Sequence, residues 1–244
     1  MTFSCRAGAR RSGFCRCSQF SISVTHNIND HGFTVVRSAI STCECEQLLS
    51  ALGTIRGAGR RGILRLSGVV ALARSARLLD LVRPHLSSDP VPVRAIYFDK
   101  SSDKNWLVAW HQDLTIALSN RGEAPGFGPW STKDGIPHVQ PPVEYLEQML
   151  TVRLHLDDAD ETNGALRVLP GSHRLGRLSA EQIQNLRAKQ TEFLCAAKAG
   201  DALLMRPLLL HASGRSRSTK HRRILHVEYA GFQLPPVLQW HEAA

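Results

Sequence analysis

The spacing of apolar residues changes along this chain, from a helical period in the first third to an alternating one beyond it. Ser41 followed by Glu44 is typical of a helix start, and leucines then recur at helical spacing through Leu52. The same spacing from Val69 to Leu86 predicts a second helix. The pattern therefore predicts helices before the main run of strands.

From residue 91 onward, apolar and polar residues mostly alternate in short segments separated by Gly, Pro, Asn and Asp. This period of two is typical of strands with one buried face, whereas a helical pattern returns once, over residues 179–190 with Ser179 as the N-cap. The overall pattern predicts a mainly β fold with flanking helices. Strands are expected within residues 29–36, 93–98, 108–118, 150–156, 165–169, 202–210 and 223–230.

Residues 119–143 contain an unusual concentration of Gly and Pro and are expected to form one long loop. A loop of this length inside a compact domain is more often a lid or a binding loop than a passive connection. Phe127, Trp130 and His138 lie in it and are candidates for shaping a substrate pocket. The alternative is that these side chains only anchor the loop.

Composition indicates an ordinary globular protein of 244 residues, with 43% hydrophobic and 21% charged residues. We expect one domain over residues 29–244 and no membrane span, because no apolar stretch is long enough. The net charge of +9 favours an anionic partner, such as a small anionic substrate. The basic residues are scattered and match no nucleic-acid-binding motif, so we expect no nucleic-acid partner. Nothing in the pattern indicates an oligomeric state.

The first 28 residues are rich in Arg and Cys and contain no acidic residue, which favours a disordered basic extension. An organellar transit segment is the alternative for residues 1–25, but we expect a cytoplasmic protein. Cys15 and Cys17, like Cys43 and Cys45, have one-residue spacing, which fits structural zinc sites poorly. Reduced, unligated thiols are therefore expected.

His111 and Asp113 are two residues apart in a predicted strand, so both side chains would lie on one face. With His211 at the end of a distant apolar run, they form the set that holds non-haem Fe(II), two histidines and one carboxylate. His-x-Asp alone is a weak signal, since a chance surface pair has the same spacing. Gln112 between the two ligands should face away from the metal. Trp106 and Trp110 beside them are expected to pack in the core.

Three motifs in this order resemble the phytanoyl-CoA dioxygenase family, over residues 29 to 232. They are His111-Gln112-Asp113, the run from Asn163-Gly164 to Pro170-Gly171-Ser172-His173, and His211-Ala212-Ser213-Gly214. The resemblance implies a double-stranded β-helix, a jelly-roll barrel similar to that of cupins. It also implies that His111, Asp113 and His211 bind Fe(II), with 2-oxoglutarate as cosubstrate and O2 as oxidant.

The family places an arginine eleven positions after the distal histidine, to pair with the far carboxylate of 2-oxoglutarate. In this chain that position is Arg222, and on an alternating strand its neighbour Arg223 would point the other way. Ser213 matches a family hydroxyl that contacts the cosubstrate. Arg153, on the polar side of its strand, is a further candidate that could instead be solvated.

The resemblance implies a dioxygenase that hydroxylates a C–H bond of a small molecule and releases succinate and CO2. Asp113 favours hydroxylation, because related halogenases lack this carboxylate. A cupin-like metal-dependent hydrolase or isomerase, or a ligand-binding barrel without turnover, could use the same fold. The hydrolase or isomerase would not require an arginine at the spacing of Arg222, and the intact triad disfavours a barrel without turnover.

Overall fold

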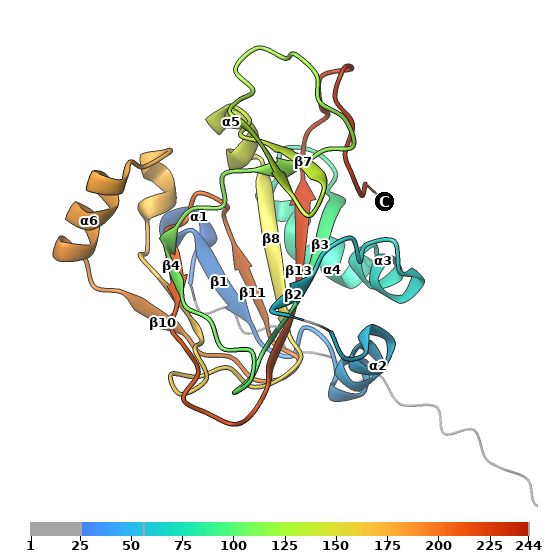
Figure 1. The fold of residues 1–244 in the computed structure, drawn as a ribbon, viewed down its shortest axis with the longest axis vertical. Helices are drawn as coiled ribbons and strands as arrows, with labels where there is room; N and C mark the ends of the chain where they lie inside the picture. Colours follow the sequence, from blue (N-terminus) through green and yellow to red (C-terminus); the bar gives the residue numbers. More distant parts are fainter. Residues whose placement is uncertain (1–25, 56, 244) are drawn as a thin grey trace, which may run out of the picture.

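Two antiparallel sheets face each other across a cavity, and helices cover the outer side of the larger sheet (Figure 1). The computed structural model describes residues 26–55 and 57–243. The predicted basic extension lies, up to residue 25, outside these residues. The mainly β architecture with flanking helices is confirmed.

The larger sheet has six strands in the order β1-β11-β8-β13-β3-β2. Alternation along its strands gives it two different faces. On β13, Leu225 and Val227 point into the apolar core, whereas Arg222 and His226 line the cavity on the other face. The strands are β1 (Phe33–Val36), β2 (Gly59–Arg60), β3 (Val91–Lys100), β8 (Met149–His155), β11 (Ala202–Met205) and β13 (Arg222–Ala230).

Three helices supply the apolar residues that cover the outer face of this sheet: α2 (Thr42–Leu52), α3 (Ser67–Ala73) and α4 (Ala76–Val82). The capping box of Ser41 and Glu44 starts α2 as predicted. The single helix expected from Val69 to Leu86 is wrong. Ser75 accepts a hydrogen bond from the Leu78 amide and begins a new helix, so the segment forms two short ones.

The smaller sheet has four strands in the order β10-β9-β12-β4 and carries the candidate ligands. The edge strand β4 pairs directly with β12, with His211 opposite His111. The strands are β4 (Val108–His111), β9 (Leu166–Val168), β10 (Phe193–Cys195) and β12 (His211–Ser213).

Two strands predicted as continuous are interrupted here. The strand expected over 108–118 ends at His111, because the Asp113 amide donates to the Pro207 carbonyl instead of continuing the ladder. The run expected over 202–210 ends at Met205, and β12 begins at His211 in the other sheet. Pro207, which lacks an amide hydrogen, lies in the turn between them.

The expected loop over 119–143 contains secondary structure. The strands β5 (Ile116–Ala117), β7 (Ile136–Val139) and β6 (Trp130–Lys133) form a small sheet, in which β6 and β7 are a hairpin. Asp134 and Gly135 form its two-residue turn, with φ of 51° and 78°. Positive φ at both turn positions is typical of a tight hairpin, and Asp-Gly suits it.

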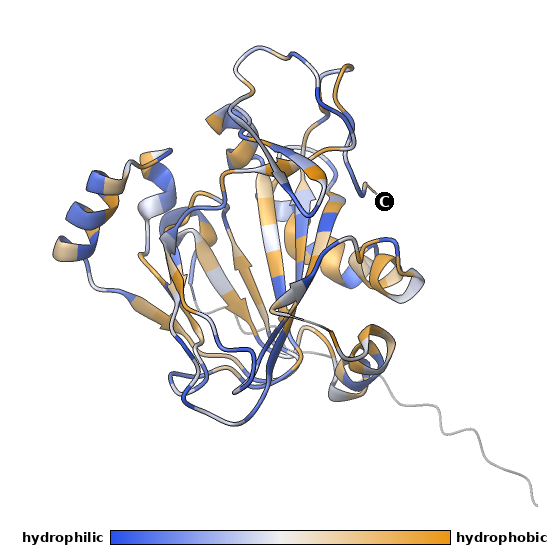
Figure 2. Cartoon of the chain, in the orientation of Figure 1, coloured by the Kyte–Doolittle hydropathy of each residue, from blue (hydrophilic) through white to orange (hydrophobic). Residues whose placement is uncertain are grey.

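The remaining elements are short or peripheral. The helix α6 (Ala180–Lys189) has no buried residue and is mostly hydrophilic, while apolar residues gather on the strands (Figure 2). No helix within the described ranges has the length and apolar character that crossing a membrane requires. The other elements are α1 (Ile28–His31), α5 (Val143–Glu147) and the 3-10 turns η1 (Arg83–His85) and η2 (Ser172–Leu175).

Candidate metal centre

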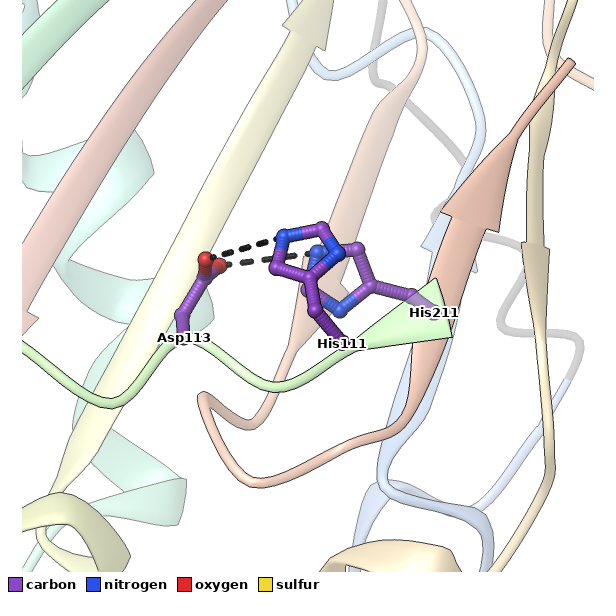
Figure 3. Close-up of side chains that lie close together, drawn as sticks. All are labelled: His111, Asp113 and His211. Carbon is purple, nitrogen blue, oxygen red and sulfur yellow. Dashed lines mark ion pairs between the residues drawn. The ribbon is translucent and has the colours of Figure 1, made fainter. Parts of the chain in front are cut away.

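His111, Asp113 and His211 converge from two segments of the smaller sheet, with Asp113 just beyond the end of β4 (Figure 3). The Nε2 atoms of His111 and His211 lie 3.6 and 3.7 Å from the two carboxylate oxygens of Asp113. One ligand atom from each residue lies within 4.8 Å of the others. Among the described residues, no other group of this kind brings three such ligands together.

Both imidazoles are already oriented for a metal ion. The Nδ1 atom of His111 is 2.9 Å from the Ala109 carbonyl, and that of His211 is 2.9 Å from the Leu209 carbonyl. A carbonyl can only accept, so each Nδ1 carries the proton and each Nε2 keeps its lone pair. The two lone pairs therefore point toward the Asp113 carboxylate, and the donor set fits a 2-His-1-carboxylate metal site.

Gln112 fixes the segment that carries Asp113. Its buried amide nitrogen donates to the carbonyls of Gly176 and Leu208, at 2.8 and 2.7 Å, and its oxygen accepts from the Leu178 amide at 2.8 Å. The side chain thus faces away from the ligands, as predicted. It ties the end of β4 to two other segments, which holds Asp113 beside the histidines although no strand continues there.

The local charges favour an ionised Asp113. Burial alone would raise the pKa of its carboxyl, but His211 and His111 beside it lower that pKa well below the usual range. Burial lowers the pKa of His211 to about 4, which keeps its imidazole neutral. A carboxylate and a neutral imidazole are the states in which these side chains bind a metal ion.

The cavity beside these three residues has a volume of about 230 Å³ and lies between the two sheets. Its lining is strongly cationic. Five of the lining residues are Arg or Lys and only Asp113 is acidic, so the lining has a formal charge of 5 − 1 = +4. Trp106, expected in the core, lines it too. The basic residues are Arg61, Arg94, Lys133, Arg153 and Arg222.

Arg222 is buried in this cavity, with 3% of its surface exposed. Its Nε and Nη1 atoms have no hydrogen-bond partner, and burial, followed by the charge of Arg153, lowers its pKa to about 9. Leaving a buried guanidinium unpaired is costly, so the site fits an anionic ligand that is not part of the chain. Arg223 instead points outward and pairs with Asp157, as the alternation predicts.

Lys100 is a residue of this site that the sequence analysis missed. It lies opposite Arg222 in the pairing of β3 with β13, is fully buried, and donates to the Ser213 hydroxyl at 2.8 Å. Burial, followed by the charges of Arg222 and Arg153, lowers its pKa to about 7. Ser213 therefore lies between the metal ligand His211 and the buried cations.

Arg153 points into the cavity and starts a chain of buried polar contacts along the larger sheet. Its Nη1 donates to Nδ1 of His226 at 2.9 Å, and Nε2 of His226 donates to Glu228 at 3.1 Å. Glu228 in turn forms an ion pair with Arg94. The solvated alternative for Arg153 is wrong, because only 7% of this residue is exposed.

The three lid candidates do not line the cavity. Phe127 and Trp130 pack against the apolar cluster beneath the loop, and Phe127 makes an edge-to-face contact with Tyr145. His138 is fully buried behind Arg94, 3.2 Å from its Nη1. The residue of this segment that reaches the cavity is Lys133, at the end of β6.

The sequence model of the phytanoyl-CoA dioxygenase family matches residues 28–224, which is most of the chain. The chain belongs to this family. The second of the three motifs, from Asn163-Gly164 to His173, has a local structural explanation in this chain. Gly164 has a φ of +75°, and a Cβ there would lie 2.5 Å from the Gly214 carbonyl oxygen. His173 packs on Gly32 and contacts the Asn29 carbonyl at 3.1 Å, so it is structural.

This chain is similar to three known proteins, one compared by sequence and two by structure. It is 25% identical over 195 residues to a probable alpha-ketoglutarate-dependent hypophosphite dioxygenase from Stutzerimonas stutzeri, covering 72% of this chain and 57% of that relative's length. The apo crystal structure of EctD from S. alaskensis has a TM-score of 0.65 at 20% identity, covering 89% of this chain and 82% of EctD.

HygX from Streptomyces hygroscopicus, solved with nickel and 2-oxoglutarate bound, has a TM-score of 0.60 at 19% identity. The match covers 83% of this chain and 84% of HygX. At such identities these two structures establish the shared fold, and the expected jelly-roll architecture is confirmed.

Proposed function

We propose that this protein is an Fe(II)- and 2-oxoglutarate-dependent dioxygenase that hydroxylates a C–H bond of a small anionic molecule. One observation carries the proposal. A ready 2-His-1-carboxylate set opens onto the same cavity as Arg222, a buried arginine with two unpaired nitrogen atoms. These are the two features that a metal ion and a dicarboxylate cosubstrate require together.

His111, Asp113 and His211 would hold Fe(II), and Arg222 with Ser213 and Lys100 would bind the far carboxylate of 2-oxoglutarate. When bound, Fe(II), 2-oxoglutarate and O2 supply an oxidant that breaks a C–H bond while the cosubstrate leaves as succinate and CO2. The planar guanidinium of Arg222 suits a carboxylate, because two parallel hydrogen bonds fix its orientation. The Ser213 hydroxyl, held by Lys100 at 2.8 Å, adds a third polar contact.

The anionic nature of the substrate is supported by the charge of the cavity. Fe(II) and 2-oxoglutarate together add no net charge. Glu228 and Asp134 pair with two of the five cations of the lining, Arg94 and Arg61, and the positive charge that is left favours an anionic substrate. The Stutzerimonas stutzeri relative is named for an anion, hypophosphite, which agrees with this inference.

The alternatives leave the buried cations without a role. A metal-dependent hydrolase or isomerase would use the three ligands but not the unpaired guanidinium of Arg222. A ligand-binding barrel without turnover would need no metal ligands with both Nδ1 atoms already bonded. The dioxygenase proposal accounts for both features at once.

Iron-dependent formation of succinate from 2-oxoglutarate tests the proposal. We expect succinate release in the presence of Fe(II), ascorbate and O2, stimulated by members of a panel of small anionic metabolites. His111→Ala should abolish this release, whereas His221→Ala should not, because His221 is exposed and lies outside the cavity. Unchanged succinate formation in His111→Ala would refute the assignment.

A further inference from the structure

Cations in and beside the cavity gather at opposite ends of the same pair of strands. Lys100 and Arg222 face each other at one end of β3 and β13, whereas Arg94 and Glu228 are paired at the other. Six residues separate Arg94 from Lys100 on β3, which is about 20 Å at the rise of an extended strand. The two groups can therefore serve two different ligands.

The end near Arg222 is used by the cosubstrate in the proposed function, so the other end is left for the substrate. Arg94, Arg61 and Lys133 line the cavity there. Arg94 is neutralised by Glu228, and Arg61 pairs with Asp134. Three cations and two carboxylates leave a net charge of 3 − 2 = +1 at this end, and the unpaired charge is that of Lys133.

Lys133 is poised to accept a further partner. Its ammonium donates to the Thr115 hydroxyl at 3.0 Å, which uses one of its three hydrogens. Thr115 is two residues from Asp113, so the contact brings the ammonium to the metal-binding segment. Partial burial, followed by the like charges of Arg94 and Arg61, lowers the pKa of Lys133. An anion between these cations would remove that repulsion.

Arg61 and Asp134 form the second half of the arrangement. The Arg61 side chain is 35% exposed and that of Asp134 is 65% exposed, so their ion pair is a weak surface contact. The pair spans from the residue after β2 to the turn of the β6–β7 hairpin, beside Lys133. Asp134 thus forms an ion pair with Arg61, a cation that also lines the cavity.

We propose that Lys133 and Arg61 form the subsite that binds the anionic group of the substrate, and that this group is a monovalent oxyanion. Asp134 is its internal competitor for Arg61. The inference rests on the proposed function, because that function assigns the far end of the cavity to 2-oxoglutarate. The inference assigns the selection of substrate charge to the β6–β7 hairpin, which carries Lys133, and to Arg61.

The test measures binding of two monovalent oxyanions, acetate and hypophosphite, with acetamide as the neutral match for acetate. Protein is loaded with Ni(II) and 2-oxoglutarate, and binding is followed by isothermal titration calorimetry. We expect both anions to bind, and Kd to rise about tenfold or more in Lys133→Gln and in Arg61→Gln, since each loses a charge-assisted contact. Asp134→Asn should lower Kd, because it frees Arg61.

Arg60→Gln is the matched control: Arg60 is exposed on β2 next to Arg61 but does not line the cavity, so Kd should stay within about twofold. Equal losses in Arg60→Gln, unchanged Kd in both cavity variants, or acetamide binding as tightly as acetate would each overturn the subsite. If only one of the two oxyanions binds, that result supports the subsite and restricts its ligands to oxyanions of that kind. If Ni(II) and 2-oxoglutarate do not load, the proposed function fails instead.

Discussion

Replacing Gln112 by Leu removes three hydrogen bonds at once from the segment that carries Asp113. The carbonyls of Gly176 and Leu208 lose their donor, and the Leu178 amide loses its acceptor. A typical hydrogen bond contributes about 1 kcal/mol net, and a buried group left unpaired costs about 1–3 kcal/mol. Since water can reach the partly buried Gly176 and Leu178 contacts, we expect a loss of about 2–4 kcal/mol in the free energy of unfolding.

The same change should weaken the metal site. Asp113 keeps its amide contact with Pro207 but loses the side-chain clamp next to it. Loss of contacts that orient metal ligands typically lowers metal affinity about 10- to 100-fold. Urea unfolding gives the first quantity, and titration with Mn(II) gives the second.

Gln112→Glu provides the stricter comparison. Glutamate has the shape of glutamine and keeps an acceptor for the Leu178 amide, but it places a carboxylate oxygen against two carbonyls. It should be at least as destabilising as leucine. Both variants unfolding within about 0.5 kcal/mol of the parent, with equal Mn(II) affinity, would refute the clamp. Gln190→Leu, an exposed change at the end of α6, should leave both quantities unchanged.

Three further outcomes are expected. Arg222→Met should raise the Kd for 2-oxoglutarate about 10- to 100-fold, while raising the melting temperature of the ligand-free protein by removing an unpaired buried charge. Lys100 has a folded-state pKa of about 7 against 10.5 unfolded, so the folded protein binds fewer protons between these values. Its contribution to the free energy of unfolding therefore rises with pH across that window. Calorimetry should also show 2-oxoglutarate binding weaken above pH 7, and Lys100→Met should remove both trends. Gly164→Ala should destabilise by about 2 kcal/mol or more in urea, because φ is +75° and the new Cβ would lie 2.5 Å from the Gly214 oxygen.

The metal triad and Arg222 could be predicted because their signal lies in spacing along the chain. His111 and Asp113 are only two residues apart, and the family resemblance gives the position of Arg222, eleven residues after His211. The residues that sequence reasoning missed have no such signal. Lys100 ends a strand as many exposed lysines do, and only its pairing with Arg222 across β3 and β13 reveals its burial.

The lid shows a different limit. Its Gly and Pro content indicates a loop, which made its aromatic residues candidates for the pocket, with anchoring of the loop as the alternative. They pack beneath it instead, because large apolar side chains gain more from burial than from lining a cationic cavity. Asp134-Gly135 was the available signal, since this dipeptide is typical of a tight hairpin turn. That turn would have directed attention to Lys133.

The two-faced character of β13 has a consequence for how this protein can vary. Arg222, His226 and Glu228 lie on the face of β13 that is turned toward the cavity, whereas the residues between them pack in the core under the helices. Inserting or deleting one residue within the strand would exchange the two sets, putting charges under α3 and α4 and leucine beside the metal. Homologues of this chain should therefore differ within β13 only by substitutions. Insertions and deletions should fall before Arg222 or after Ala230.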